Sequence, residues 1–207
     1  MKGLILKDLY QLKSYSRVFI AVLFMCVLMA FDDENTIFLM IYPSVIMGMM
    51  PITMYAYDEK AKFHGFLATL PVKKQTYVTA KYLFGLGLNI AACLLMGSIQ
   101  MVQTLTKGTF IFSELAMAVA LALAVGLVAP AVILPFIFAL GTEKGRFVNI
   151  IAVGFTLLLI NVFMNSGNNF QILLDEQQKV LAAILVGGGL YFLSCCISIV
   201  ICNKKEY

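Results

Sequence analysis

The chain has 207 residues, of which 61% are hydrophobic and 13% are charged, and its formal net charge is +4. A soluble domain carries about 45–50% apolar and about 25% charged residues, so this composition excludes an ordinary water-soluble globular domain and indicates a chain surrounded by lipid. Basic residues that flank membrane spans account for the positive charge, which gives no reason to expect a nucleic-acid partner.

The chain opens with an amphipathic segment over residues 1–16. At 100° per residue, one arc of a helix here carries the apolar side chains Ile5, Leu6, Leu9, Tyr10 and Leu12. The opposite arc carries the polar side chains Lys7, Asp8, Gln11 and Ser14. Two faces of this kind predict an interfacial helix lying on the inner leaflet. The alternative is a plain basic flank of the first membrane span.

Six apolar runs follow, and a helix needs roughly 20 residues to cross about 30 Å of hydrocarbon. The first run is short, with 14 residues from Val18 to Phe31. The predicted spans are Arg17–Phe31, Thr36–Tyr55, Tyr82–Leu105, Leu115–Leu140, Phe147–Asn165 and Val180–Cys202. The fourth contains Pro130 and Pro135, which predict a kink or a break near its end. The predicted fold is an all-α polytopic membrane protein, with one transmembrane domain over residues 1–207. Its parts are spans one and two (17–56), an inside loop (57–81), spans three and four (82–140) and spans five and six (147–202).

The basic residues decide the orientation of these spans. If the N-terminus lies inside, only Lys107 and Lys179 fall outside, which leaves 13 of the 15 Lys and Arg residues on the inner side. Basic residues concentrate on the cytoplasmic side of membrane proteins. The sequence therefore predicts a multi-pass protein of the cell (plasma) membrane with both termini in the cytoplasm.

The longest inside loop, residues 57–81, contains a short predicted helix. Asp58 and Glu59 are acids that suit a helix N-terminus, and Pro71 ends the helical pattern. Between them, an apolar stripe at i, i+3, i+4 and i+7 is formed by Phe63, Phe66, Leu67 and Leu70. Such a helix can lie on the bilayer or insert into a groove of a cytosolic partner, and periodicity does not separate the two.

Polar side chains inside the predicted spans are few and uncharged. The candidates for a translocation path are Asn89, Gln100, Gln103, Asn161 and Asn165. The alternative is that they hydrogen-bond between helices. No zinc-protease, nucleophile-elbow or phosphate-loop motif occurs, so we expect no catalytic, cofactor or metal site on this chain. An ATP-driven function needs an ATPase on another chain.

Two stretches of the sequence resemble small permeases of the ABC-2 transporter family. They are MKGLILKDLY at residues 1–10, and the stretch from YDEK at residues 57–60 to LPVKK at residues 70–74. The order of helices and spans resembles that family over the whole chain. The resemblance implies that Asp58–Leu70 is a coupling helix seated in a separate cytosolic ABC ATPase, which holds ATP and Mg²⁺. It further implies a connecting helix at Met1–Tyr15, an outer re-entrant piece at Ser166–Lys179, and a dimer of permease chains.

Within the family, the chain is most similar to compact bacterial permeases that export amphipathic or antimicrobial peptides, including the phenol-soluble modulin exporters. This resemblance implies an exporter of an amphipathic peptide or lipid-like substrate. The alternative is an immunity or sensor subunit that binds membrane-active peptides without transporting them. The sequence does not name the substrate, and it does not decide between a homodimer and a heterodimer.

Overall fold

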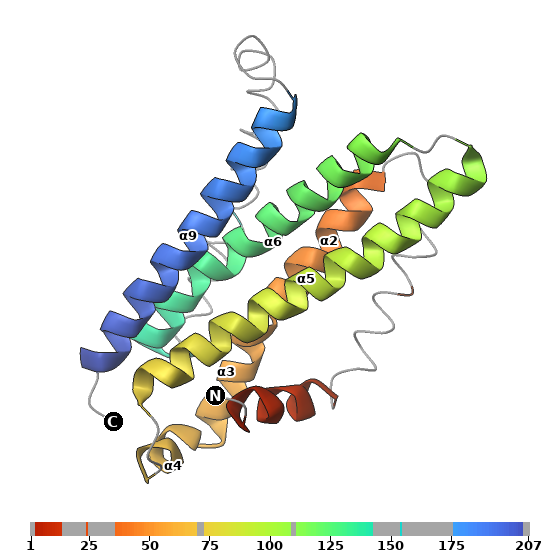
Figure 1. Ribbon diagram of the computed structural model, residues 1–207. Coiled ribbons are helices and arrows are strands. Elements are labelled where there is room, and N and C mark those ends of the chain that lie inside the picture. The colour runs from red at the N-terminus through yellow and green to blue at the C-terminus, as the bar shows by residue number, and fades with distance from the viewer. Residues whose placement is uncertain are drawn as a thin grey trace.

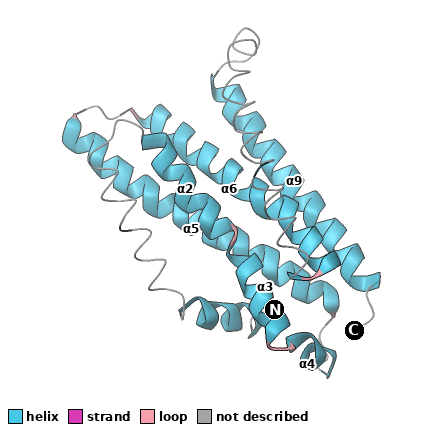
Figure 2. Cartoon of the chain, turned by 180° about the vertical axis from the view of Figure 1, so that it is seen from behind, coloured by secondary structure: helices cyan, strands magenta, loops and turns pink. Residues whose placement is uncertain are grey.

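The computed structural model describes residues 3–13, 24, 36–69, 73–108, 111–142, 154 and 176–204, and all regular structure in them is helical (Figure 2). An N-terminal helix covers residues 3–13. The other helices are α2 (Thr36–Gly48), α3 (Met50–Lys60), α4 (Phe63–Thr69), α5 (Lys74–Lys107), α6 (Phe112–Leu140) and α9 (Glu176–Lys204). The predicted all-α class is confirmed.

Three of the described helices are long and apolar enough to cross a membrane. They are α5, α6 and the part of α9 from Ile184 to Lys204. They coincide with the third, fourth and sixth predicted spans, and α5 and α9 extend several residues beyond the predicted ends. Apart from residues 24 and 154, the spans predicted at Arg17–Phe31 and Phe147–Asn165 lie outside the described residues, as do residues 166–175 of the predicted outer piece.

The helix α6 runs unbroken through both of its prolines. Of the two predicted alternatives near its end, a kink or a break, the break is therefore wrong. A proline has no N–H to donate to the carbonyl four residues earlier. For Pro135 that carbonyl belongs to Ala131, and it accepts a hydrogen bond from the Ser194 hydroxyl of α9 at 2.5 Å instead. A neighbouring helix can satisfy the carbonyl that a proline frees, and the helix then continues.

The second predicted span, Thr36–Tyr55, is divided into α2 and α3 at Met49. Pro51 lies in the first turn of α3, where its missing N–H is tolerated. The turn is closed by the Met49 N–H, which donates to the Val45 carbonyl at 3.0 Å. Residues 56–60 contain neither glycine nor proline, and α3 continues through them to Lys60.

The long helices lie side by side, and α6 packs mainly against α2 and α9 (Figure 1). The short helices α3 and α4, the start of α5 and the end of α9 gather at one end of this bundle, which we call the α4 end. The N-terminal helix lies across the same end beside α3 (Figures 1 and 2). The largest apolar core cluster includes Tyr55, Leu67, Tyr77 and Phe138, and it joins α3, α4, α5 and α6.

The N-terminal helix is amphipathic as predicted, and its polar face is the one that meets the protein. Leu6, Leu9 and Tyr10 are 54%, 46% and 68% exposed, whereas Asp8 is buried. Ile5 and Leu12, at the edges of the apolar arc, pack against the cluster of Met50, Met54 and Phe84. The bundle therefore holds this helix mainly through its charged side.

Candidate functional site

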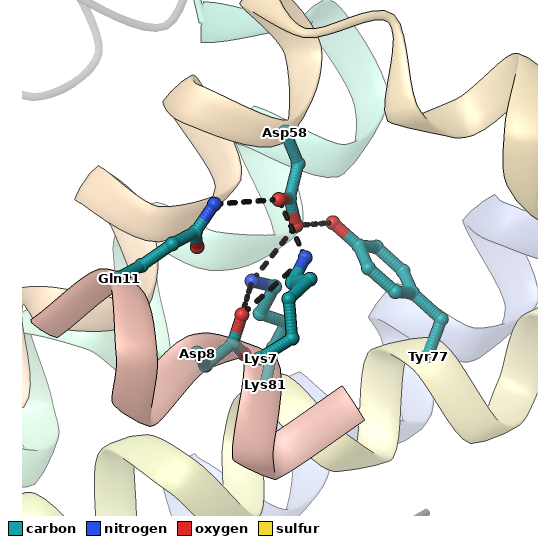
Figure 3. A network of polar contacts seen from close by, with 6 residues as sticks. All are labelled: Lys7, Asp8, Gln11, Asp58, Tyr77 and Lys81. Atoms are coloured by element: carbon teal, nitrogen blue, oxygen red, sulfur yellow. Dashed lines mark hydrogen bonds and ion pairs between the residues drawn. The ribbon is translucent and has the colours of Figure 1, made fainter. Parts of the chain in front are cut away.

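Polar side chains from three elements meet at the α4 end (Figure 3). We call this group the charge cluster. It comprises Lys7, Asp8 and Gln11 of the N-terminal helix, Asp58 of α3, and Tyr77 and Lys81 of α5. The cluster joins segments that are up to 73 positions apart in the sequence.

Lys81 lies at the centre of the charge cluster. Its Nζ is 2.8 Å from Asp8 Oδ1 and 2.9 Å from Asp58 Oδ2, and the side chains of all three residues are only 1% exposed. Lys7 is closer to the surface, at 26% exposed, and its Nζ is 2.5 Å from Asp58 Oδ1 and 3.4 Å from Asp8 Oδ1. Two cations and two anions therefore balance each other. Balance matters here because a single unpaired charge in such a place is strongly destabilising.

Asp58 also accepts two hydrogen bonds from uncharged groups. The Tyr77 hydroxyl donates to Oδ2 at 2.8 Å, and the Gln11 amide donates to Oδ1 at 3.5 Å. Burial by itself raises the pKa of Asp58, but the charge of Lys81 and the hydrogen bonds from Lys7, Lys81 and Tyr77 outweigh burial and hold the pKa below its ordinary value. Asp58 is therefore ionised at neutral pH.

The short helix α4 is attached to the charge cluster through Phe63. Lys7 Nζ lies 4.0 Å from the centroid of the Phe63 ring, which is a cation–π contact. The same ring lies 6.4 Å from the Tyr77 ring and 5.9 Å from the Phe66 ring. Leu67 is buried in the core cluster, whereas Phe66 is 57% exposed. Two side chains thus fix α4 to the bundle, and a third projects away from it.

Residues 3–203 match the family model described as ABC-2 family transporter protein. The chain belongs to the ABC-2 transporter family. It is accordingly a multi-pass membrane protein and the membrane permease component of an ABC-2 transporter. Permeases of this family typically lack catalytic activity and generally work with an ABC ATPase subunit, which binds the ATP. No curated protein and no solved structure matches this chain significantly.

The sequence pattern predicted that Asp58 and Glu59 of this ABC-2 permease begin a helix, and the structure shows that they do not. They lie in the last turn of α3, and a turn at residues 61–62, where Lys62 has a φ of 52°, separates them from α4. Asp58 is bound in the charge cluster. Glu59 Oε2 accepts hydrogen bonds from the backbone N–H of Thr142 at 2.8 Å and from the Thr142 hydroxyl. Both acids therefore bind within the permease and fix the end of α3.

The predicted coupling residues fall into three groups. Asp58 and Glu59 fix α3, as described above. Phe63, Phe66 and Leu67 share the helix α4, which covers Phe63–Thr69 of the stretch predicted to be helical to Leu70. Leu70 lies outside the described residues. Among the predicted apolar residues that the structure describes, Phe66 is therefore the one that α4 exposes most.

The polar residues predicted for the translocation path also lie in different surroundings. Asn89 is fully buried; its Oδ1 is 2.5 Å from the Ser44 hydroxyl of α2, and its amide donates to the Leu123 carbonyl of α6 at 3.4 Å. In this structure Asn89 therefore connects three helices. Gln100 Oε1 and Gln103 Nε2 are buried and have no hydrogen-bond partner within the described part of the permease. Asn161 and Asn165 lie outside the described residues.

Sequence reasoning named only Asp58 of the charge cluster as a site residue, and it missed the other five: Lys7, Asp8, Gln11, Tyr77 and Lys81. The sequence placed Lys81 in the inside loop as one basic flank among several. In the structure α5 begins at Lys74, so Lys81 lies in the third turn of a helix and faces inward. Its spacing contained a signal, because Tyr77, Lys81, Gly85 and Asn89 recur every four residues and share one helix face.

Proposed function

We propose that this permease is the membrane subunit of an ABC exporter, and that α4 docks into a cleft of a separate cytosolic ATPase. The exposed Phe66 on the firmly attached helix α4 carries this proposal. Exposed Lys60, Lys62 and Lys73 flank the helix on the sequence. An aromatic anchor with a basic rim suits a cleft that has an apolar floor and acidic edges.

The direction of the chain supports the proposed topology of six spans with both termini in the cytoplasm. The N-terminal helix lies at the α4 end, whereas α2 begins at the opposite end of the bundle (Figure 1). Likewise, α6 ends at the α4 end, and α9 begins at the opposite end. The chain has to pass from one end to the other between residues 13 and 36, and again between residues 142 and 176. Added to the four crossings made by α2 with α3, by α5, by α6 and by α9, these two bring the proposed number to six.

We propose an amphipathic peptide or a lipid-like molecule as the substrate. The charged side chains of the described helices gather at the ends, and the middle parts of these same helices offer only uncharged polar groups. A second permease chain, identical or related, completes the path. The helix α9 supports such a pairing, because residues such as Leu185, Phe192 and Leu193 expose an apolar surface to lipid or to another chain.

We expect the substitution Phe66→Asp to abolish retention of the ATPase. The permease is purified from its native cells through an affinity tag, and the ATPase that accompanies it is quantified. Aspartate removes the apolar anchor and places a negative charge against the proposed acidic edge of the cleft, so the yield of ATPase should fall at least about tenfold, which corresponds to about 1.4 kcal/mol of binding free energy.

Phe112→Asp is the matched control, because Phe112 is an exposed phenylalanine at the start of α6, at the other end of the bundle. This variant should retain the ATPase as the wild type does. If both variants retained the same amount of ATPase, α4 would not be part of the docking surface. A complex that binds the ATPase and still moves no amphipathic peptide across vesicles with ATP would favour the immunity or sensor alternative.

The unpaired amides of α5 lead to a separate prediction about the path. Gln103 is 95% buried, and its Nε2 has no partner among the residues that the structure describes; leaving such a donor unsatisfied costs about 1–3 kcal/mol. Gln103→Leu should therefore keep or raise the melting temperature while it lowers ATP-driven uptake of a labelled amphipathic peptide by inverted vesicles. Met101→Leu, on the exposed side of the same helix, is the control. If the Gln103→Leu variant took up the peptide as the wild type does, Gln103 would serve helix packing and not the translocation path.

A further inference from the structure

The charge cluster is poorly explained as a source of stability. Moving an ion out of water costs several kcal/mol, and a buried ion pair repays this only with good geometry, so well-packed apolar groups often serve as well or better. What such a cluster does supply is a definite arrangement of the elements that carry the charges. Here those elements are the N-terminal helix, α3 and α5, and α4 touches the cluster from outside.

Contacts lead from α4 into the cluster along two routes. Phe63 lies under the Lys7 ammonium, so a displacement of α4 acts on the N-terminal helix. Phe63 also lies beside the Tyr77 ring, so the same displacement acts on α5. Both routes meet at Asp58, which binds Lys7 at 2.5 Å and accepts the Tyr77 hydrogen bond at 2.8 Å.

The N-terminal helix is held from both sides. Leu6, Leu9 and Tyr10 face away from the protein, and an apolar surface of this kind fits the inner leaflet of a bilayer. Its opposite face is fixed by Asp8, which forms the 2.8 Å ion pair with Lys81 of α5. A helix that rests on lipid and binds α5 by a buried ion pair can move only as far as α5 moves with it.

We propose that the N-terminal helix is a second coupling element, which passes motion of α4 to the long helix α5 through Lys7, Asp8 and Lys81. These three are positioning residues: they touch neither nucleotide nor substrate. The inference rests on the proposed function, because it needs an ATPase that moves α4. It adds that docking of α4 alone is insufficient, and that the charge cluster transmits the motion to the spans.

The test measures distances between spin labels in the complex of permease and ATPase, reconstituted in vesicles, with and without a non-hydrolysable ATP analogue. The five native cysteines are replaced, and new ones are introduced in pairs at exposed positions. Thr69→Cys with Leu185→Cys reports on α4 relative to α9. Lys107→Cys with Leu185→Cys reports on α5 relative to α9. We expect the nucleotide analogue to shift both distances in the otherwise native protein.

The decisive variant is the double substitution Lys81→Met with Asp8→Asn, which removes one cation and one anion and keeps the cluster neutral. We expect it to retain the ATPase and the shift of the Thr69 label, and to lose the shift of the Lys107 label, because α5 is no longer tied to the N-terminal helix. A purely structural cluster would leave both shifts intact, and that result overturns the proposal.

Lys7 provides a second variant that stays close to the surface and disturbs folding less. Lys7→Gln removes the contact with Phe63 and should abolish the shift of the Lys107 label. Lys7→Arg keeps a cation that can bind both the ring and the carboxylate, so it should preserve the shift. A full shift in Lys7→Gln also overturns the inference. Failure of the proposed function differs from both outcomes, because then no ATPase is retained and the Thr69 label does not respond.

Discussion

Replacing Lys81 alone by methionine is expected to cause the largest loss of stability of any single substitution in the charge cluster. Methionine has about the same length and removes the cation that lies between Asp8 and Asp58. The two carboxylates then share Lys7, whose Nζ is 3.4 Å from Asp8 Oδ1. Removing one partner of a buried ion pair costs about 3–5 kcal/mol. We expect that loss in the free energy of unfolding, measured by denaturant titration in detergent at neutral pH.

Lys73→Met is the control for this substitution, because Lys73 is exposed just before α5 and substitutions at such positions usually change stability by less than about 0.5 kcal/mol. The pH dependence provides a further check. The lowered pKa of Asp58 contributes stability at neutral pH, and that contribution is lost only as the pH falls through the lowered value. In Lys81→Met a carboxylate without its cation takes up a proton more readily, so the deficit should shrink toward pH 4. If Lys81→Met lost no more unfolding free energy than Lys73→Met, that result would contradict the buried ion pairs.

The helices of this permease could largely be predicted from its sequence, and the charge cluster could not. Apolar runs located α5, α6 and α9 because lipid demands long apolar helices whatever their tertiary contacts. The pairing of Asp8 with Lys81 depends on how two remote helices pack, and no local period encodes it. Each residue also had a sufficient local explanation, one as part of a polar arc and the other as a basic flank.

The N-terminal helix shows a second limit of pattern analysis. The sequence identifies two faces, but it does not say which face meets the protein. In water the apolar face turns to the core, because burial removes it from solvent. Beside a bilayer the apolar face can turn to lipid instead, and then the polar face is free to bind the protein. Leu9 and Asp8 are adjacent in the sequence and illustrate the result: Leu9 is exposed and Asp8 is buried.

A close approach of α2 and α6 leads to the second large prediction. Gly48, at the end of α2, lies against the backbone carbonyl of Gly126 in α6, and a Cβ added at residue 48 would overlap that oxygen. This carbonyl is the one that Pro130 leaves without an intrahelical donor, because Pro130 is four residues later. A backbone atom cannot swing aside as a side chain can. The substitution Gly48→Ala therefore has to push α2 away from α6.

We expect Gly48→Ala to lower the free energy of unfolding by about 3 kcal/mol, the upper part of the range for overpacked sites. Gly87→Ala is the matched control, because a Cβ at residue 87 meets no atom within 4 Å, and alanine favours a helix over glycine by about 0.5–1 kcal/mol. Helices in lipid are held together by close packing and interhelical hydrogen bonds rather than by exclusion of water. Separating α2 from α6 also stretches the 2.7 Å hydrogen bond that the Ser44 hydroxyl of α2 donates to the Ala122 carbonyl of α6, so the cost extends beyond one methyl group. Equal unfolding free energies for the two alanine variants would show that α2 and α6 do not touch at Gly48.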